Sequence, residues 1–111
     1  MLVAIASTDG ETVNEHFGRA DRFLIYDISE QGGTLLSIRQ VTPWSVGEAD
    51  HEFAEERFAA LADSLADCSR IYCSHIGARP RRELEQRGIT VVTGSRRISD
   101  IAVDRDWMQS S

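Results

Sequence analysis

One short stretch of the sequence, residues 9–26, holds the side chains best suited to chemistry. It offers one histidine beside an aromatic residue and a glycine, followed by two arginines: His16, Phe17, Gly18, Arg19 and Arg22. A neutral imidazole ligates metal ions, an aromatic side chain anchors a loop in a core, and glycine permits a tight turn. Guanidinium groups attract anions. The pattern therefore indicates an imidazole on an anchored loop with two positive charges near it.

A second candidate set, Cys73 and His75, follows an apolar run that begins at Ile71. A thiolate or an imidazole at the end of a strand is a potential metal ligand. The ordinary alternatives are a small buried hydrophobe for Cys73 and an exposed polar residue for His75. For His16 the alternative is a histidine that hydrogen-bonds a loop carbonyl and holds the turn.

Cys68 lies at the opposite end of the strand predicted for residues 69–73. The five residues of that strand span about 16 Å at roughly 3.3 Å each. A disulfide needs Cα atoms within about 7 Å. The sequence therefore predicts that Cys68 is structural, that Cys73 is accessible to thiol reagents, and that the two are not bonded.

The elements that must position these residues alternate between strands and helices. Short apolar runs predict strands at residues 2–6, 23–26, 34–41, 69–73 and 89–92, with a hairpin turn at 30–33. Apolar residues at helical spacing predict helices at residues 51–66, at 79–87, and from about Ser95 onward. Pro80 suits the first turn of the second helix and Gly88 its end, and Ile98, Ile101 and Ala102 suit the inner face of the last helix.

This order, β-β-β-α-β-α-β-α, predicts an α/β fold with a mixed five-stranded sheet, as in ribonuclease-H-like folds. In that topology the first strand lies beside residues 69–73, so the loops after Ser7 and Cys73 leave the same carboxyl edge. Ligands of open α/β sheets bind in the crevice at that edge. We therefore expect His16, Cys73 and His75 to face one another.

Composition limits the class of protein. A chain of 111 residues is expected to form a single domain, 1–111, with an ordinary core. The net charge of −6 disfavours nucleic-acid and membrane partners. There is no apolar run of about 20 residues and no signal peptide, and two cysteines do not suggest a disulfide scaffold, so we expect a cytoplasmic protein. Motifs for nucleotides, zinc proteases and paired CxxC sites are absent.

Two segments, Val3–Tyr26 and Ile71–Ala78, together resemble the dinitrogenase iron–molybdenum cofactor-binding family. The match continues weakly through Leu84 and Gly88–Ile89. That family includes nitrogenase accessory proteins that carry the iron–molybdenum cofactor or its precursor. The resemblance implies the ribonuclease-H-like, three-layer fold and one cofactor-binding domain.

The resemblance also implies a function, a non-catalytic carrier that aids cofactor biosynthesis and insertion. His16 would be the principal ligand, Cys73 or His75 an auxiliary, and Arg19 and Arg22 the charge complements. Proteins that assemble their own clusters supply about four cysteines, so an iron–molybdenum cofactor or iron–sulfur precursor would arrive preformed and bind transiently. The expected partners are a cofactor-assembly scaffold and apo-dinitrogenase.

Two alternatives remain from the sequence. A ribonuclease-H-like nuclease needs several carboxylates converging on two divalent ions. Here Asp9 and Asp21 lie in predicted loops and Asp27 ends a predicted strand, which disfavours a nuclease. The second alternative is a general metal-handling or regulatory protein of the same fold.

Overall fold

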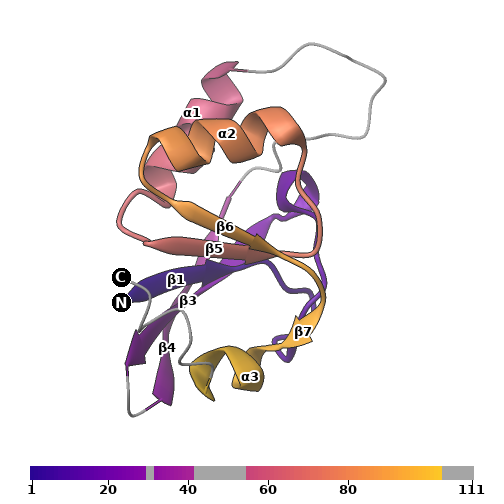
Figure 1. Ribbon diagram of the computed structural model, residues 1–111, viewed down its shortest axis with the longest axis vertical. Helices are drawn as coiled ribbons and strands as arrows, with labels where there is room; N and C mark the ends of the chain where they lie inside the picture. The colour runs from indigo at the N-terminus through magenta and orange to yellow at the C-terminus, as the bar shows by residue number, and fades with distance from the viewer. Residues whose placement is uncertain (30–31, 42–54, 104–111) are drawn as a thin grey trace.

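A mixed β-sheet forms the centre of the computed structural model, which describes residues 1–29, 32–41 and 55–103 (Figure 1). The sheet has five strands in the order β4-β3-β1-β5-β6. These strands are β1 (Leu2–Ile5), β3 (Arg22–Ser29), β4 (Gly32–Gln40), β5 (Arg70–Cys73) and β6 (Thr90–Thr93). Each corresponds to a predicted strand, and β3 and β4 are longer than predicted.

The directions of the strands bring two loops to one edge of the sheet. β1 runs antiparallel to β3 and parallel to β5, with Ala4 opposite Ile71. The predicted placement of the first strand beside residues 69–73 is therefore confirmed. Ser29 pairs with Gly32 across the predicted hairpin, whose residues 30 and 31 lie outside the described residues.

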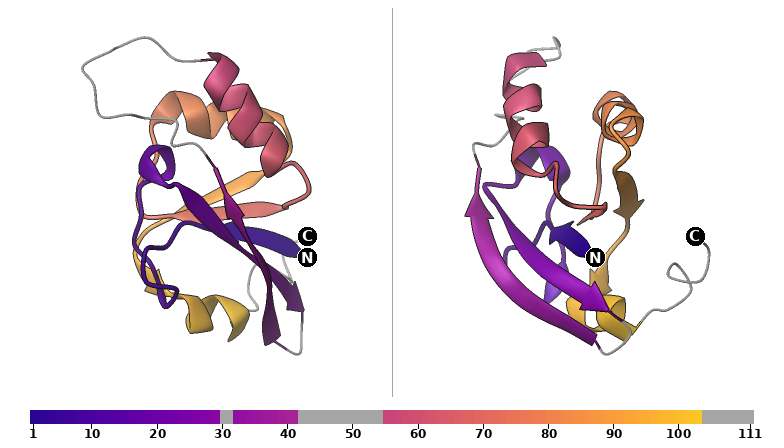
Figure 2. Two further views of the ribbon diagram at one scale, coloured as in Figure 1. Left: turned by 180° about the vertical axis from the view of Figure 1, so that it is seen from behind. Right: turned by 90° about the vertical axis from the view of Figure 1, so that its left-hand side faces the viewer.

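Helices lie on both faces of the sheet (Figure 2). α1 (Glu55–Ser64) and α2 (Ala78–Gln86) cover one face, and α3 (Ile98–Val103) lies on the other. Successive side chains of a strand point to opposite faces. Along β1, Ala4 accordingly packs in the cluster under α1 and α2, whereas Val3 and Ile5 pack in the cluster under α3.

Two short strands were not predicted. β2 (Thr12–Val13) and β7 (Arg96–Arg97) pair antiparallel in a separate two-stranded sheet. β7 occupies residues where the last helix was expected to begin, so α3 starts at Ile98 rather than near Ser95. A two-residue strand has too few positions to show an alternating pattern, so the predicted element order was incomplete.

Helix α1 ends earlier than predicted. The prediction covered residues 51–66, of which 51–54 lie outside the described residues. The helix ends at Ser64, because the amides of Leu65 and Ala66 donate to carbonyls three residues back, as in a tightened last turn.

α2 and α3 keep most of the features predicted for them. Gly88 follows α2 with a φ of 86°, a left-handed conformation that glycine adopts at little cost. Pro80 lies in the first turn of α2, where its missing amide breaks no helical hydrogen bond. Ile98 and Ile101 of α3 are buried as predicted, and the side chain of Ala102 lies outside the described residues.

Arg39 fastens the outer strand β4 to the end of α1. Its guanidinium donates to both carboxylate oxygens of Asp67, at 2.6 Å each, and to the Ser64 carbonyl at 2.7 Å. The last carbonyls of a helix lack partners within the helix, and this contact satisfies one of them. The guanidinium also lowers the pKa of Asp67 from 3.8 to about 2.

Asp67→Asn is expected to lower the free energy of unfolding by about 0.5–1 kcal/mol, as for other exposed ion pairs. Because the folded-state pKa of Asp67 is lowered, its contribution is complete above about pH 3.8 and is lost as the pH falls toward 2. Urea unfolding of both proteins across this range checks the prediction. The two stabilities should converge at low pH, and a constant offset would show that the ion pair is not its source.

Candidate functional site

The segment Glu15–Phe17 lies against the carboxyl ends of β1 and β5. Three main-chain hydrogen bonds hold it there: Glu15 N–H to the Ala6 carbonyl (3.4 Å), Ser74 N–H to the Glu15 carbonyl (2.9 Å) and Phe17 N–H to the His75 carbonyl (2.9 Å). His16 and His75 consequently form an isolated parallel β-bridge. Neighbouring strands lie about 4.8 Å apart, so the two histidines are adjacent at the edge where ligands of such sheets bind.

His16 also caps the short 3-10 helix η1 (Phe17–Arg19). Its Nδ1 accepts a hydrogen bond of 2.9 Å from the Gly18 amide. The ordinary alternative for this histidine, holding its turn, is therefore part of the structure. The partner is an amide N–H and not the carbonyl that was expected, because the first amides of a helical turn lack acceptors.

The surroundings of His16 favour its neutral form. Burial lowers its pKa below 6.5, and the positive charges of Arg19 and His75 lower it further, against a weaker opposite effect of Glu15. A neutral imidazole is the form that ligates metals. The lowered pKa accordingly favours the neutral ring at pH 7.

His75 is exposed, and its ring is held by its neighbour in sequence. Its Nδ1 lies 3.1 Å from the Ser74 hydroxyl oxygen. No protein atom in residues 1–29, 32–41 and 55–103 forms a hydrogen bond with its Nε2. The Nε2 atom of His75 could therefore serve as a second imidazole donor beside His16.

Arg19 and Arg22 line one pocket of about 620 Å³. Arg22 donates from Nη2 to the Thr8 carbonyl at 2.9 Å, which fixes its guanidinium beside the loop after β1. Glu15 and Asp21 line the same pocket, so it carries charges of both signs. The two predicted charge complements thus share a cavity next to the segment that carries His16.

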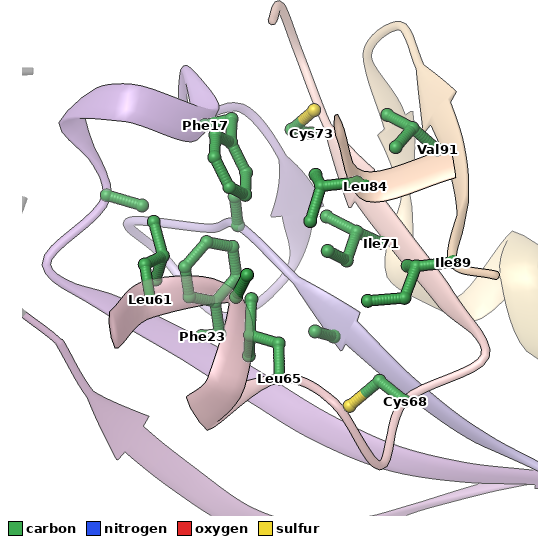
Figure 3. Packing of buried hydrophobic residues seen from close by; sticks show 14 of the residues in the cluster. Phe17, Phe23, Leu61, Leu65, Cys68, Ile71, Cys73, Leu84, Ile89 and Val91 are labelled. Carbon is green, nitrogen blue, oxygen red and sulfur yellow. The ribbon is translucent and has the colours of Figure 1, made fainter. Parts of the chain in front are cut away.

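Cys73 does not join this group in the structure, and the prediction that it is accessible is wrong. Its side chain is 0% exposed and packs in the cluster with Phe17 and Leu84 (Figure 3). Cys73 and Ile71 share a face of β5, and that face lies under α1 and α2. Burial raises the pKa of the Cys73 thiol to about 11, which suppresses the thiolate that a metal would need.

Cys68 is buried as well, and both cysteines are free thiols, as predicted for their separation. Burial raises the pKa of Cys68 to about 11, the same value as for Cys73. A rise of two units leaves about 100-fold less thiolate at a given pH.

Thiol labelling of the native protein is therefore expected to be slow at both cysteines, at least about 100-fold slower than in urea, where the ordinary pKa and full access return. Mass spectrometry after timed labelling separates the two positions. Rapid labelling of Cys73 alone in the native protein would show that the edge of the sheet opens readily.

Asp9 organises the loop after β1. Its carboxylate accepts hydrogen bonds from the amides of Glu11 and Thr12, at 2.8 and 2.9 Å, and from the hydroxyls of Thr12 and Ser7. These bonds hold its pKa well below the usual range, the two amides contributing most. The loop position predicted for Asp9 is confirmed, and an Asp-Gly pair is a common turn former.

The described residues contain no group of three or more histidine, cysteine, aspartate or glutamate side chains placed to hold a metal ion. A metal site at His16 and His75 would offer two imidazole donors and would not surround the ion with protein ligands. Within the same ranges, none of the helices has the length and apolar character needed to cross a bilayer.

Residues 1–104 match the protein-family model described as dinitrogenase iron–molybdenum cofactor. The chain belongs to this family. The resemblance carried by the two motifs is confirmed, and the match covers β1, β5 and the His16 segment, which together build the edge described above.

Relatives with known names support the same family. FeMo cofactor biosynthesis protein NifB of Klebsiella pneumoniae is 42% identical over 90 residues, which are 79% of this chain and 19% of NifB. Protein NifX of Azotobacter vinelandii is 34% identical over 80% of this chain and 53% of NifX. The crystal structure of PH0822 superposes with a TM-score of 0.68 at 27% identity, covering 97% of this chain and 99% of that one. The chain thus spans about a fifth of NifB and about half of NifX.

Proposed function

We propose that this chain binds and carries the iron–molybdenum cofactor, or an iron–sulfur precursor of it, without catalysing a reaction on it. The observation that carries the proposal is the pairing of His16 with His75 at the carboxyl edge of the sheet. Membership of the family and the names of NifB and NifX support a part in cofactor biosynthesis.

The donor set suits a cargo that must be released. Imidazole nitrogen is a good ligand for iron and other transition metals. Two such donors leave most of the cluster's coordination to its own sulfides. Arg19 and Arg22, which line the adjacent pocket, complement an anionic cluster. Cys73 would ligate only after the core around it opened, so the proposal does not depend on it.

Several broader assignments belong to the same proposal. Residues 1–111 would act as one cofactor-binding domain of the ribonuclease-H-like class, which the strand order β4-β3-β1-β5-β6 supports. A cofactor-assembly scaffold would supply the cluster, and apo-dinitrogenase would receive it. Because the chain spans only part of NifB and NifX, the activities of those whole proteins are not carried over.

Anaerobic titration with isolated iron–molybdenum cofactor tests the proposal, followed by the electron paramagnetic resonance signal of the cofactor. The native chain is expected to perturb the signal stoichiometrically. A variant with both His16→Asn and His75→Asn should bind at least about ten-fold more weakly, the effect of losing roughly 1.4 kcal/mol of ligation. Equal binding by this variant would place the site elsewhere, and a native chain that leaves the signal unchanged would refute the proposal.

The same preparation tests the two alternatives. The carboxylate of Asp9 is occupied by its own loop, so we expect no cleavage of an RNA–DNA hybrid with Mg²⁺ or Mn²⁺. Cleavage that copurifies with the chain and is lost in Asp9→Asn would favour the nuclease. A general metal-handling protein would instead bind simple ions such as Zn²⁺ more tightly than the cofactor.

A further inference from the structure

The two histidines of the site differ in the kind of partner that each ring has. His16 Nδ1 accepts from the Gly18 amide at 2.9 Å. His75 Nδ1 lies 3.1 Å from the Ser74 hydroxyl. An amide N–H only donates, whereas a hydroxyl both donates and accepts. This difference decides which ring offers a lone pair to an approaching metal.

A neutral imidazole carries one proton and one lone pair, on different nitrogens. In His16 the lone pair is on Nδ1, where Gly18 uses it, so Nε2 carries the proton. This ring presents an N–H donor and no lone pair at Nε2. His75 can place its proton on Nδ1 and donate it to Ser74, which leaves a lone pair on Nε2 without loss of the contact.

We propose that His75 is the first metal ligand, and that His16 becomes the second only when its hydrogen bond to Gly18 breaks. The inference rests on the proposed function, since it concerns the same site. In the second step the proton of His16 leaves Nε2, a proton is taken up at Nδ1 from solvent, and the Nε2 lone pair binds the metal. The Gly18 amide loses its acceptor. Metal binding at His16 therefore breaks the side-chain cap of η1. Until then, the hydrogen bond from the Gly18 amide prevents His16 from acting as a ligand.

The step is local, because the rest of the turn has its own bonds. The amides of Arg19 and Ala20 both donate to the His16 carbonyl at 3.1 Å, and the Phe17 amide donates to His75. None of these uses the imidazole. The backbone of the site thus remains in place while the ring of His16 changes its partner.

Nuclear magnetic resonance of the ¹⁵N-labelled chain tests the proposal with Zn²⁺ alone as the probe, at constant pH. Without metal, the ring nitrogens of His16 should show the form with the proton on Nε2. During the titration the His75 ring signals should shift first, and the Gly18 amide signal should shift only in a later phase. His75→Asn is expected to weaken Zn²⁺ binding at least ten-fold and to move the change of the Gly18 amide signal to higher Zn²⁺ concentration.

His16→Asn is the matched control. The asparagine Oδ1 takes the place of Nδ1 as acceptor for Gly18, so the first phase should remain and the second should vanish. The proposal is overturned if Zn²⁺ does not bind, if His75→Asn binds Zn²⁺ as the native chain does, or if Gly18 is unchanged when His16 is ligated. Zn²⁺ loading in this order by a chain that ignores the cofactor would refute the carrier function alone.

Discussion

Replacing His16 with alanine is expected to lower both the stability of the protein and its affinity for cofactor, whereas asparagine is expected to lower the affinity alone. Alanine removes the acceptor for the Gly18 amide, and loss of an N-cap costs about 1 kcal/mol, within a range of roughly 0.5–2. Asparagine keeps the acceptor and removes only Nε2. Both variants should bind cofactor at least about ten-fold more weakly.

Urea unfolding and anaerobic cofactor titration of the three proteins measure the two effects separately. An affinity that falls in His16→Ala but is unchanged in His16→Asn would assign His16 a purely structural role. Ser99→Ala, an exposed substitution on α3 and outside the site, is a suitable control and should change neither quantity.

The pH dependence of His16 follows from its lowered pKa. A proton that must be removed before ligation weakens binding as the pH falls, and the midpoint should lie below the ordinary value of 6.5. The free energy of unfolding also falls as the pH falls, because the unfolded chain takes up this proton at higher pH than the folded one. The contribution of neutral His16 to the free energy of unfolding is complete above about pH 6.5 and is lost as the pH falls through the folded-state pKa. In His16→Asn this part of both profiles should be absent.

Phe17→Ala is expected to have the largest effect on stability, a loss of about 3–5 kcal/mol. Phe17 is 0% exposed, and its ring centroid lies 5.9 Å from that of Phe23 and 6.5 Å from that of Phe58. Truncation leaves a cavity between the site segment, β3 and α1 (Figure 3). Cofactor affinity should fall too, because Phe17 directly follows His16 and anchors the segment that carries it.

Denaturant unfolding by circular dichroism measures the loss, and Phe17→Leu is the matched control. Leucine fills most of the volume, so it should lose a much smaller part of the stability and retain cofactor binding. If alanine and leucine were equally mild, the ring would not be the anchor that its burial indicates.

The strands of the sheet were predictable because short apolar runs and turn residues mark them locally. The pairing of His16 with His75 was also within reach, since strand order places both loops at one edge. The short strands β2 and β7 were not, because their pairing depends on a contact between residues 85 positions apart, Thr12 and Arg97, that no local pattern records.

The burial of Cys73 and the hydrogen-bond partner of the His16 ring could not be predicted from the sequence, for a related reason. Whether a residue at a strand end is covered depends on what packs over the edge, and here Phe17 closes the cluster around Cys73. The choice between a carbonyl and an amide partner for His16 depends on the φ and ψ angles of one turn. Both are set by tertiary structure and not by residue type.

Main-chain hydrogen bonds fasten the segment that carries His16 to β1 and β5. Every non-proline residue can make those bonds, so the platform does not depend on the side chains at positions 16 and 75. Asparagine, aspartate or serine at position 16 would still cap η1, while softer or harder donors at either position would suit different metals. Substitutions at positions 16 and 75 would therefore be expected to change the metal preference of this edge while leaving its backbone unchanged.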